Sequence, residues 1–382
     1  MISYQYFLAA LSLVSVKTIE SRISCRNNEG DPVDWFVGYK LPVTNEHKTS
    51  LKGIEFIYAG PHSQSWTTPL NISSEQNAVG ATLAQLYKND TSNVWIAYND
   101  DHPGDSHSDA YRAHAKGVLL FDVQTGFLFI HSVPNFPSVP SYSYPKSGHR
   151  YGQSFLCVTL KTDSLTELGT QLQYMQPSIY WSNIPSPLAV KYPDIAQVIA
   201  RRRFRPRKPY TSVARLTSQD GIQFTSYVKH KKFNKDLYAD LVVPETRTPL
   251  VAETWLNGAE DLPSNCSSGH EVFNVREENV LGRSFESSKD HAKWAASTNK
   301  QVPFVCIGDI NRQPSQFDRG GGALCFENTQ IWRLFNSSVR RVESCPINDV
   351  QTQIKKDSHT EDVSFIHEWL DAFKNWWNKI TG

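Results

Sequence analysis

The sequence predicts a mixed α/β (α+β) protein built from two similar halves, each a central mixed β-sheet flanked by helices. Short apolar segments bounded by Gly, Pro, Asn or Asp recur in both halves, as is typical of strands. The string His-Ala-Lys, of the form His-x-Lys, occurs twice, at His114–Lys116 and His291–Lys293. With 382 residues, 39% of them hydrophobic, the chain is long enough to bury two sizeable cores.

In the first half, near-continuous apolar runs predict central strands that are covered on both faces. The expected strands are 35–39, 54–58, 94–98, 117–121, 127–130 and 155–160. Apolar residues at helical spacing predict helices at 80–87 and 163–173.

The second half repeats this texture. Strands are expected at 222–227, 241–243, 250–255 and 304–307, followed by a helix near 328–335. A proline- and serine-rich connector at 180–193 places the boundary between the halves at about 160 to 190. We divide the chain into a signal peptide and three further parts, namely 1–20, 21–170, 171–349 and 350–382.

Each His-x-Lys string leads into an apolar stretch and then into a polar turn that carries an asparagine, Asn135 or Asn311. The lysine-to-asparagine intervals are 19 (135 − 116) and 18 (311 − 293) residues. A single His-x-Lys string means little in a chain with 12 histidines and 39 basic residues. Two copies with matching surroundings predict one active site built from both halves.

This residue set suits phosphoryl transfer. One imidazole can attack phosphorus, and a second, protonated imidazole can donate a proton to the leaving alkoxide. On a strand, residues i and i+2 share a face, so the lysine of each string can lie beside its histidine and contact a phosphate oxygen. We expect His114, Lys116, His291 and Lys293 to be catalytic.

Longer motifs resemble the deoxyribonuclease II family. They comprise Gly30–Phe36 and Tyr39–Pro42, His114–Leu120, His131–Pro137 and Tyr151–Gln153, and in the second half Leu262–Cys266, Asp290–Trp294, Cys306–Arg312 and Arg319–Cys325. The resemblance spans about residues 25–346. It implies two phospholipase D-like domains forming a pseudo-dimer, and a metal-independent, cofactor-free acid endonuclease that cuts double-stranded DNA to 3′-phosphate ends.

The resemblance also assigns residues. His291 takes the main active-site role beside Lys293, His114 and Lys116 come from the first half, and Asn135 and Asn311 support the site. It implies the disulfides Cys25–Cys157, Cys266–Cys345 and Cys306–Cys325. The superfamily places an aspartate five residues after the lysine, but Phe121 stands there, so we interpret Asp122 as a turn residue.

The compartment can be read from the amino terminus and from the cysteines. Residues 7–16 form an apolar run that is too short to span a bilayer and suits a signal peptide. Six cysteines and sequons at Asn71, Asn89, Asn265 and Asn336 fit a secretory route to the lysosome or outside the cell. No zinc-type cysteine or histidine spacing occurs, and no metal site is expected.

The formal charge is only +1 at pH 7. Protonation of 12 histidines in an acidic compartment would add up to about twelve positive charges and would strengthen binding to DNA.

Three other segments carry open interpretations. The basic run 201–208 suits DNA-backbone contact, a solvated loop or a processing site. The glycines of 319–322 suit either tight turns or anion binding. The tail from Ser358 onward predicts an amphipathic helix that contacts the protein body, a partner or a membrane surface.

An acid DNase is thus the leading hypothesis. The alternatives are a secreted, non-catalytic DNA-binding or effector homologue and a phosphodiesterase acting on another diester. Which histidine attacks and which donates the proton is not decided by the sequence.

Overall fold

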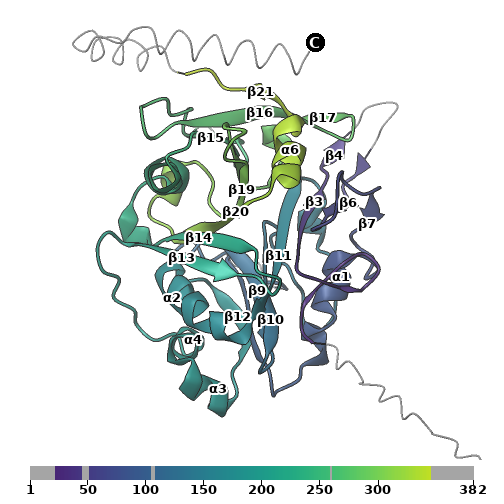
Figure 1. Ribbon diagram of the computed structural model, residues 1–382, viewed down its shortest axis with the longest axis vertical. Coiled ribbons are helices and arrows are strands. Elements are labelled where there is room, and N and C mark those ends of the chain that lie inside the picture. Colours follow the sequence, from purple (N-terminus) through teal and green to yellow (C-terminus); the bar gives the residue numbers. More distant parts are fainter. Residues whose placement is uncertain (1–21, 45–50, 105–107, 259, 346–382) are drawn as a thin grey trace, which may run out of the picture.

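The computed structural model describes residues 22–44, 51–104, 108–258 and 260–345. The expected signal peptide and carboxyl-terminal helix lie outside these residues. The fold is mixed α/β, with two large, mainly antiparallel sheets and a small number of helices, as predicted (Figure 1).

The first sheet has eight strands in the order β12-β8-β9-β10-β11-β3-β6-β7. All neighbouring strands in it are antiparallel. Its members are β3 (Trp35–Lys40), β6 (Glu55–Ala59), β7 (Leu70–Asn71), β8 (Val94–Asn99), β9 (Lys116–Phe121), β10 (Thr125–His131), β11 (Gln153–Lys161) and β12 (Ile179–Asn183). The six strands expected in the first half are therefore confirmed.

The second sheet has nine strands in the order β13-β14-β20-β19-β18-β15-β16-β17, with β21 also paired to β16. Only β15 and β16 run parallel. Its members are β13 (Thr211–Thr217), β14 (Gln223–Lys229), β15 (Leu250–Glu253), β16 (Val272–Val280), β17 (Arg283–Glu286), β18 (Trp294–Ser297), β19 (Phe304–Gly308), β20 (Gly321–Glu327) and β21 (Val339–Val342). Two small hairpin sheets pair β1 (Cys25–Arg26) with β2 (Pro32–Val33) and β4 (Val43–Thr44) with β5 (Leu51–Lys52).

The two large sheets share a four-strand unit, β8-β9-β10-β11 in the first and β15-β18-β19-β20 in the second. In both units the second strand follows a His-x-Lys string directly. The strings were expected within strands, but only Lys116 belongs to one, as the first residue of β9, and β18 begins one residue after Lys293. Each string thus lies at the amino-terminal end of the second strand of its unit.

Helices account for a smaller part of the chain. They are α1 (Ala78–Leu83), α2 (Leu165–Met175), α3 (Ser186–Lys191), α4 (Pro193–Ile199), α5 (Val243–Thr246) and α6 (Thr329–Ser338), together with the short helical turns η1 (Leu86–Lys88), η2 (Lys146–Gly148), η3 (Thr162–Ser164), η4 (Lys231–Phe233), η5 (Tyr238–Val242), η6 (Ser287–Lys289) and η7 (Pro314–Gln316). The helices predicted near 80–87, 163–173 and 328–335 are confirmed as α1 with η1, α2 and α6.

Two sequence-based expectations were wrong. The apolar run 241–243 is not a strand but part of η5 and α5, because the carboxylate of Asp236 accepts hydrogen bonds from the backbone N–H groups of Tyr238 (2.7 Å) and Ala239 (3.2 Å) and starts a helix. The connector at 180–193 contains most of β12 and all of α3, and α4 begins at its last residue. Pro187 and Pro193 occupy first helical turns, where the missing N–H is tolerated.

Both faces of the first sheet are buried. Trp35 and Val37 of β3 belong to a core shared with the second sheet, whereas Phe36 faces a separate cluster on the outer side under α1. The ring centroids of Trp35 and Phe326 lie 5.1 Å apart, so the shared core joins the two sheets directly. Helix α2 also bridges them, because Gln171 hydrogen-bonds Ser212 (2.7 Å) and Ser226 (3.1 Å) of the second sheet.

Three disulfides are present, Cys25–Cys157, Cys266–Cys345 and Cys306–Cys325. They are the pairs that the family resemblance implies. Cys25–Cys157 joins β1 to β11 of the first large sheet. Cys306–Cys325 joins paired positions of the neighbouring strands β19 and β20.

Features expected at the surface are placed as follows. Asn71 and Asn89 are exposed, whereas Asn265 and Asn336 are half-buried. The carboxylate of Asp122 accepts hydrogen bonds from the backbone N–H groups of Gln124 (2.6 Å) and Thr125 (2.8 Å), which confirms it as a turn residue between β9 and β10. Among the described residues, no helix has the length and apolar character needed to cross a membrane.

A buried acidic cluster lies where the halves meet. We define it as Glu253, Glu278 and Asp290, whose carboxylate oxygens lie within 4.8 Å of one another, together with Tyr39 from the first half. The Tyr39 hydroxyl donates to Asp290 and lies 3.2 Å from Glu278 Oε2. All four side chains are buried, at most 1% exposed.

Burial raises the pKa of Glu253 and of Glu278 well above 4.5, and the nearby charge of Asp290 raises both further. The Glu278 carboxyl is therefore protonated in the folded protein at pH values where it is ionised in the unfolded chain. Between pH 4.5 and the raised pKa of the folded state, the native protein binds one more proton at this carboxyl than the unfolded chain does. The contribution of the carboxyl to the stability of the folded protein therefore falls as pH rises.

We predict that Glu278→Gln, which keeps the shape and the neutral state, removes this dependence. The free energy of unfolding of the wild type, relative to the variant, should fall by about 1.4 kcal/mol per pH unit above pH 4.5. The check is the thermal unfolding midpoint of both proteins at pH 4.5, 5.5 and 6.5.

The matched control is Glu245→Gln, because Glu245 is an exposed glutamate on α5. Its unfolding midpoints should follow those of the wild type. Parallel curves for wild type and Glu278→Gln would contradict the assignment of a buried, protonated carboxyl.

Candidate active site

The two His-x-Lys strings meet at the junction between the sheets. His114 is buried, and its Nδ1 lies 2.6 Å from the backbone carbonyl oxygen of Asp309, the residue that follows β19. His291 is also buried, and its Nδ1 lies 3.0 Å from the carbonyl oxygen of Ser132, the residue that follows β10. Each histidine is thus held by a backbone carbonyl of the opposite half.

The two contacts are equivalent in the repeated unit. The offset between the histidines (291 − 114) and the offset between the carbonyls (309 − 132) are both 177 residues. In each unit, the second strand follows the histidine and the third strand leads to the carbonyl that holds the other histidine. The duplication seen in the sequence is therefore a reciprocal pair of contacts in the structure.

A carbonyl oxygen can only accept a hydrogen bond, so each imidazole carries a hydrogen on Nδ1. For His291, two acceptors near Nδ1, the Ser132 carbonyl oxygen and the Gln153 side-chain oxygen (3.3 Å), favour this assignment over the single donor there, Lys293 Nζ. In the neutral ring, Nε2 then carries the lone pair. Both histidines consequently present Nε2 as the atom that can attack or exchange a proton.

The first lysine is held by a carboxylate. Lys116 donates to Asp100, and the guanidinium of Arg319 lies 3.1 Å from the other oxygen of that carboxylate. Asp100 Oδ2 also lies 3.9 Å from Nε2 of His114. Burial alone would raise the pKa of Asp100, but Lys116, His114 and Arg319 together lower it below its usual value, so the carboxylate is ionised.

The second lysine is buried more deeply, with 1% of its surface exposed. Lys293 Nζ donates to the backbone carbonyl oxygen of His291 (2.7 Å) and lies 3.0 Å from Nδ1 of the same residue. Its Nζ also faces the ring of Trp255, 5.8 Å from the centroid. Burial, and then the charge of Lys116, lower the pKa of Lys293 well below 10.5.

The histidines are difficult to protonate. Burial lowers the pKa of His114 well below 6.5, and the charge of Lys116 lowers it further, whereas Asp100 raises it. Burial and the charges of Lys293 and Lys116 lower the pKa of His291 in the same way. A carboxylate therefore lies close to His114, whereas the charged groups that act most strongly on His291 are cations.

The two asparagines expected to support the site have other surroundings in this structure. Asn135 adopts a left-handed conformation (φ 58°), and its side-chain amide donates to the carbonyl oxygen of His102 (2.9 Å). Asn311 is buried, and its side-chain oxygen has no hydrogen-bond partner among the described residues. Neither side chain hydrogen-bonds a histidine or lysine of the two strings within the described part of the chain.

Several residues at the site were not identified from the sequence. Asp100 follows β8 directly, so its signal was a polar residue at the end of a predicted strand, and Gln153 begins β11 and lies in the motif Tyr151–Gln153 without an assigned role. Asp309 provides a carbonyl to His114, and its own carboxyl has a pKa raised to about 7, mainly by burial. Ser132 contributes through its backbone, which leaves no side-chain signature.

The glycine run 319–322 serves close packing. The carbonyl oxygen of Gly320 accepts a hydrogen bond from the backbone N–H of His114 (2.9 Å), and a Cβ atom at Gly320 would lie 2.0 Å from the carbonyl oxygen of Met175. Gly152 has the same function beside His291. Its carbonyl oxygen accepts from the His291 N–H (3.0 Å), and a Cβ there would lie 2.1 Å from the carboxylate of Asp290.

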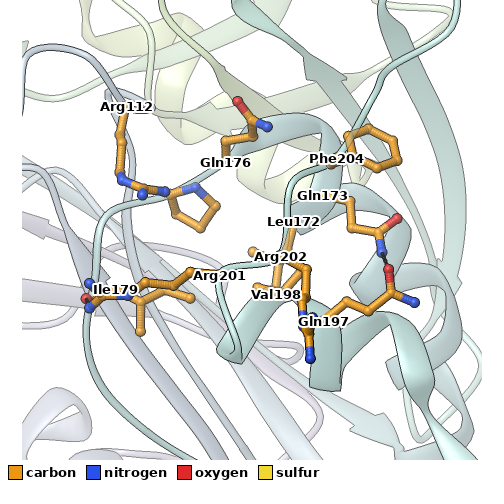
Figure 2. Close-up of a pocket in the computed structure, with 11 residues that line it drawn as sticks. Arg112, Leu172, Gln173, Gln176, Ile179, Gln197, Val198, Arg201, Arg202 and Phe204 are labelled. Atoms are coloured by element: carbon orange, nitrogen blue, oxygen red, sulfur yellow. Dashed lines mark hydrogen bonds between the residues drawn. The ribbon is translucent and has the colours of Figure 1, made fainter.

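A basic pocket of about 440 Å³, including the open space at its mouth, lies near the first string. One of its lining residues is Arg112, two positions before His114 in the sequence. Arg112, Arg201 and Arg202 line it, together with Gln176 and Phe204 (Figure 2). Arg319 connects the pocket to the site, because its guanidinium donates to the carbonyl oxygen of Arg112 (3.0 Å) and to Asp100. Part of the basic run 201–208 therefore lies close to the first His-x-Lys string.

The chain is similar to known proteins over most of its length. The family model of deoxyribonuclease II matches residues 24–345. Cell-death-related nuclease 7 of Caenorhabditis elegans is 43% identical over 343 residues, which cover 89% of this chain and 92% of that protein. Deoxyribonuclease-2-alpha of Rattus norvegicus is 38% identical, covering 88% and 98%, and plancitoxin-1 of Acanthaster planci is 36% identical, covering 88% and 96%.

The match extends over all parts of the chain that build the paired histidines, their carbonyl partners and the three disulfides. On this evidence the chain belongs to the deoxyribonuclease II family.

Proposed function

We propose that this protein is an acid endodeoxyribonuclease that cleaves double-stranded DNA without a metal ion and leaves 3′-phosphate ends. The observation that carries the proposal is the reciprocal contact described above, in which two buried histidines from two halves each present Nε2 at one site. Lys116 and Lys293 supply positive charge for the non-bridging oxygens of a phosphodiester.

The reaction runs in two steps. In the first, Nε2 of one histidine attacks phosphorus, the bond from phosphorus to the 5′ oxygen breaks, and the second histidine donates its proton to that oxygen. In the second step, the histidine that donated its proton takes a proton from water. The water oxygen attacks phosphorus, and the bond from phosphorus to the nucleophilic histidine breaks. The phosphate stays on the 3′ oxygen throughout.

We assign the nucleophile to His291 and the general acid to His114. The carboxylate of Asp100, 3.9 Å from Nε2 of His114, favours the imidazolium form there. His291 faces two lysines instead, and these charges favour the neutral ring that a nucleophile needs. Asn135 and Asn311 support the loops that follow the third strand of each unit.

Acid activity follows from the same electrostatics. A general acid must be protonated, and the pKa of His114 lies below 6.5 because of burial and Lys116. Activity should therefore be present below that lowered pKa and be lost as pH rises through it. An acidic, secretory compartment, lysosomal or extracellular, suits this requirement, as do the disulfides and the expected signal peptide.

We further propose that DNA passes from the histidines over the basic pocket of Arg112, Arg201 and Arg202. Guanidinium groups bind phosphates in a bidentate manner, and Phe204 in the lining offers an apolar surface. The two sheets are the two phospholipase D-like halves of the enzyme in this proposal.

The first test is plasmid nicking across pH 4 to 8 in excess EDTA. We predict that His114→Ala and His291→Ala each reduce cleavage by about 10²- to 10⁴-fold or more, because the first step needs one histidine as nucleophile and the other as general acid. The exposed His62 provides the control, and His62→Ala should cleave like the wild type. Near-normal activity in either catalytic variant would exclude a shared site, and an inactive wild type would favour a DNA-binding homologue or another diester substrate.

The assignment of roles predicts the effect of Asp100→Asn. Loss of this carboxylate lowers the pKa of His114 further, so the alkaline limb of kcat/KM against pH should move to lower pH by about 1 unit or more. The measurement is the pH profile, with thermal unfolding at each pH as a check of folding. If Asp100→Asn shifts the acid limb of kcat/KM against pH instead, His114 is the group that must be deprotonated and is therefore the nucleophile.

The basic pocket predicts a salt effect. Arg201→Gln/Arg202→Gln should raise the KM for DNA and reduce the slope of log KM against log salt concentration by about 2, one for each lost phosphate contact. The charge-matched control is Arg333→Gln/Arg340→Gln, because these exposed arginines lie on α6 and β21, at the end of the molecule away from α4 (Figure 1). Equal slopes for the two double variants would exclude the pocket from DNA binding.

A further inference from the structure

The ring of Trp255 lies directly against the proposed nucleophile. Trp255 comes two residues after β15, and its ring centroid lies 4.4 Å from that of the His291 imidazole, with the planes at 70°. The ring is half-buried, so part of it remains accessible beside the histidine. None of the reaction steps described above uses this side chain.

Trp255 is held in an unusual backbone conformation. Its φ is 58°, in the left-handed region that bulky residues rarely adopt. The backbone N–H of Trp255 donates to Glu253 Oε1 (2.7 Å), and the Ser287 hydroxyl donates to the same oxygen (2.7 Å). A buried carboxyl thus fixes the ring where it stands, and strain of this kind is concentrated at functional positions.

The aromatic surface continues to the outside of the molecule. The centroid of Tyr151 lies 5.5 Å from that of Trp255, and the guanidinium carbon of Arg150 lies 5.1 Å from the Tyr151 centroid. Arg150 is exposed and Tyr151 is half-buried. We call Arg150, Tyr151 and Trp255 the aromatic ladder, which runs from the surface to His291 and crosses the junction between the halves.

We propose that the aromatic ladder is a stacking subsite for a nucleobase next to the scissile phosphate. The inference rests on the proposed function, and it adds a contact to the base where that function requires only the phosphate. Bases stack on aromatic rings through their flat faces, and Arg150 adds a cation beside the outer ring. A base in this subsite has left the helical stack of DNA.

Such a subsite has a consequence for specificity. All four bases have similar flat faces, whereas sequence is read from the hydrogen-bonding edges of the bases. Stacking on Trp255 and Tyr151 therefore binds the strand beside the cleaved bond without selecting a sequence. An enzyme that degrades DNA in general needs this kind of contact.

The competing role for Trp255 is to position His291 only. The two roles separate when the base itself is removed. The test uses a series of duplexes, each with a single stable abasic site. The abasic site moves by one nucleotide from one duplex to the next, and cleavage is measured at the same phosphodiester in all of them. The wild-type enzyme on the intact duplex first shows whether the proposed nuclease activity exists at all.

We expect one abasic position to lower kcat/KM of the wild type roughly tenfold, the usual effect of one lost stacking contact. Trp255→Gly should lower kcat/KM on intact DNA by a similar factor, and the abasic site should cause no further loss in this variant. Glycine adopts a φ of 58° without strain, so the variant removes the ring and keeps the backbone. Trp255→Phe should retain most of the stacking.

The matched control is Leu281→Gly, because Leu281 is an exposed residue with a φ of 52° in the turn between β16 and β17. Leu281→Gly relieves the same kind of backbone strain away from the site. It should leave kcat/KM on intact DNA and on abasic DNA at the wild-type values. If no abasic position affects the wild type, or if the losses from the abasic site and from Trp255→Gly multiply, Trp255 does not stack a base and the proposal is overturned.

Discussion

The site depends on two hydrogen bonds that cross between the halves of the chain. A backbone carbonyl cannot rotate away or change its charge, so Asp309 and Ser132 fix the tautomer and the direction of His114 and His291 more firmly than side chains would. The close approach this requires explains the glycines nearby, the shared core and the strand order repeated in both sheets. The fold can be understood as the means of bringing each histidine to the carbonyl of the other half.

Buried histidines and buried glutamates at this junction have opposite effects on the pH dependence of stability. Histidines that are neutral when buried favour folding at higher pH, because the unfolded chain binds more protons below pH 6.5. The carboxyls of Glu253 and Glu278, which hold protons when buried, favour folding at lower pH. The two slopes oppose each other between about pH 4.5 and 6.5. A protein that works in acid can in this way bury titratable groups of both kinds at its centre.

The sequence predicted the fold class, the strands of the first half and the four paired side chains, because apolar periodicity and an exact string are local signals. It did not predict β13, β16, β17, β18 or β20, whose many polar and small residues interrupt the apolar pattern. It placed a strand at 241–243, where one capping aspartate favours a helix. Asp100 and the carbonyl of Ser132 were missed because only tertiary structure gives them a role.

The crossed contacts also set an order in time. A chain leaves the ribosome from its amino terminus, and His114 emerges 195 residues before the carbonyl that orients it. The growing polypeptide therefore carries one histidine string of a nuclease, complete in sequence, with neither its partner string nor its fixed orientation. The paired site can form only after the chain has been synthesised and folded as far as Asp309, so the architecture itself delays the assembly of the site until most of the described residues are in place.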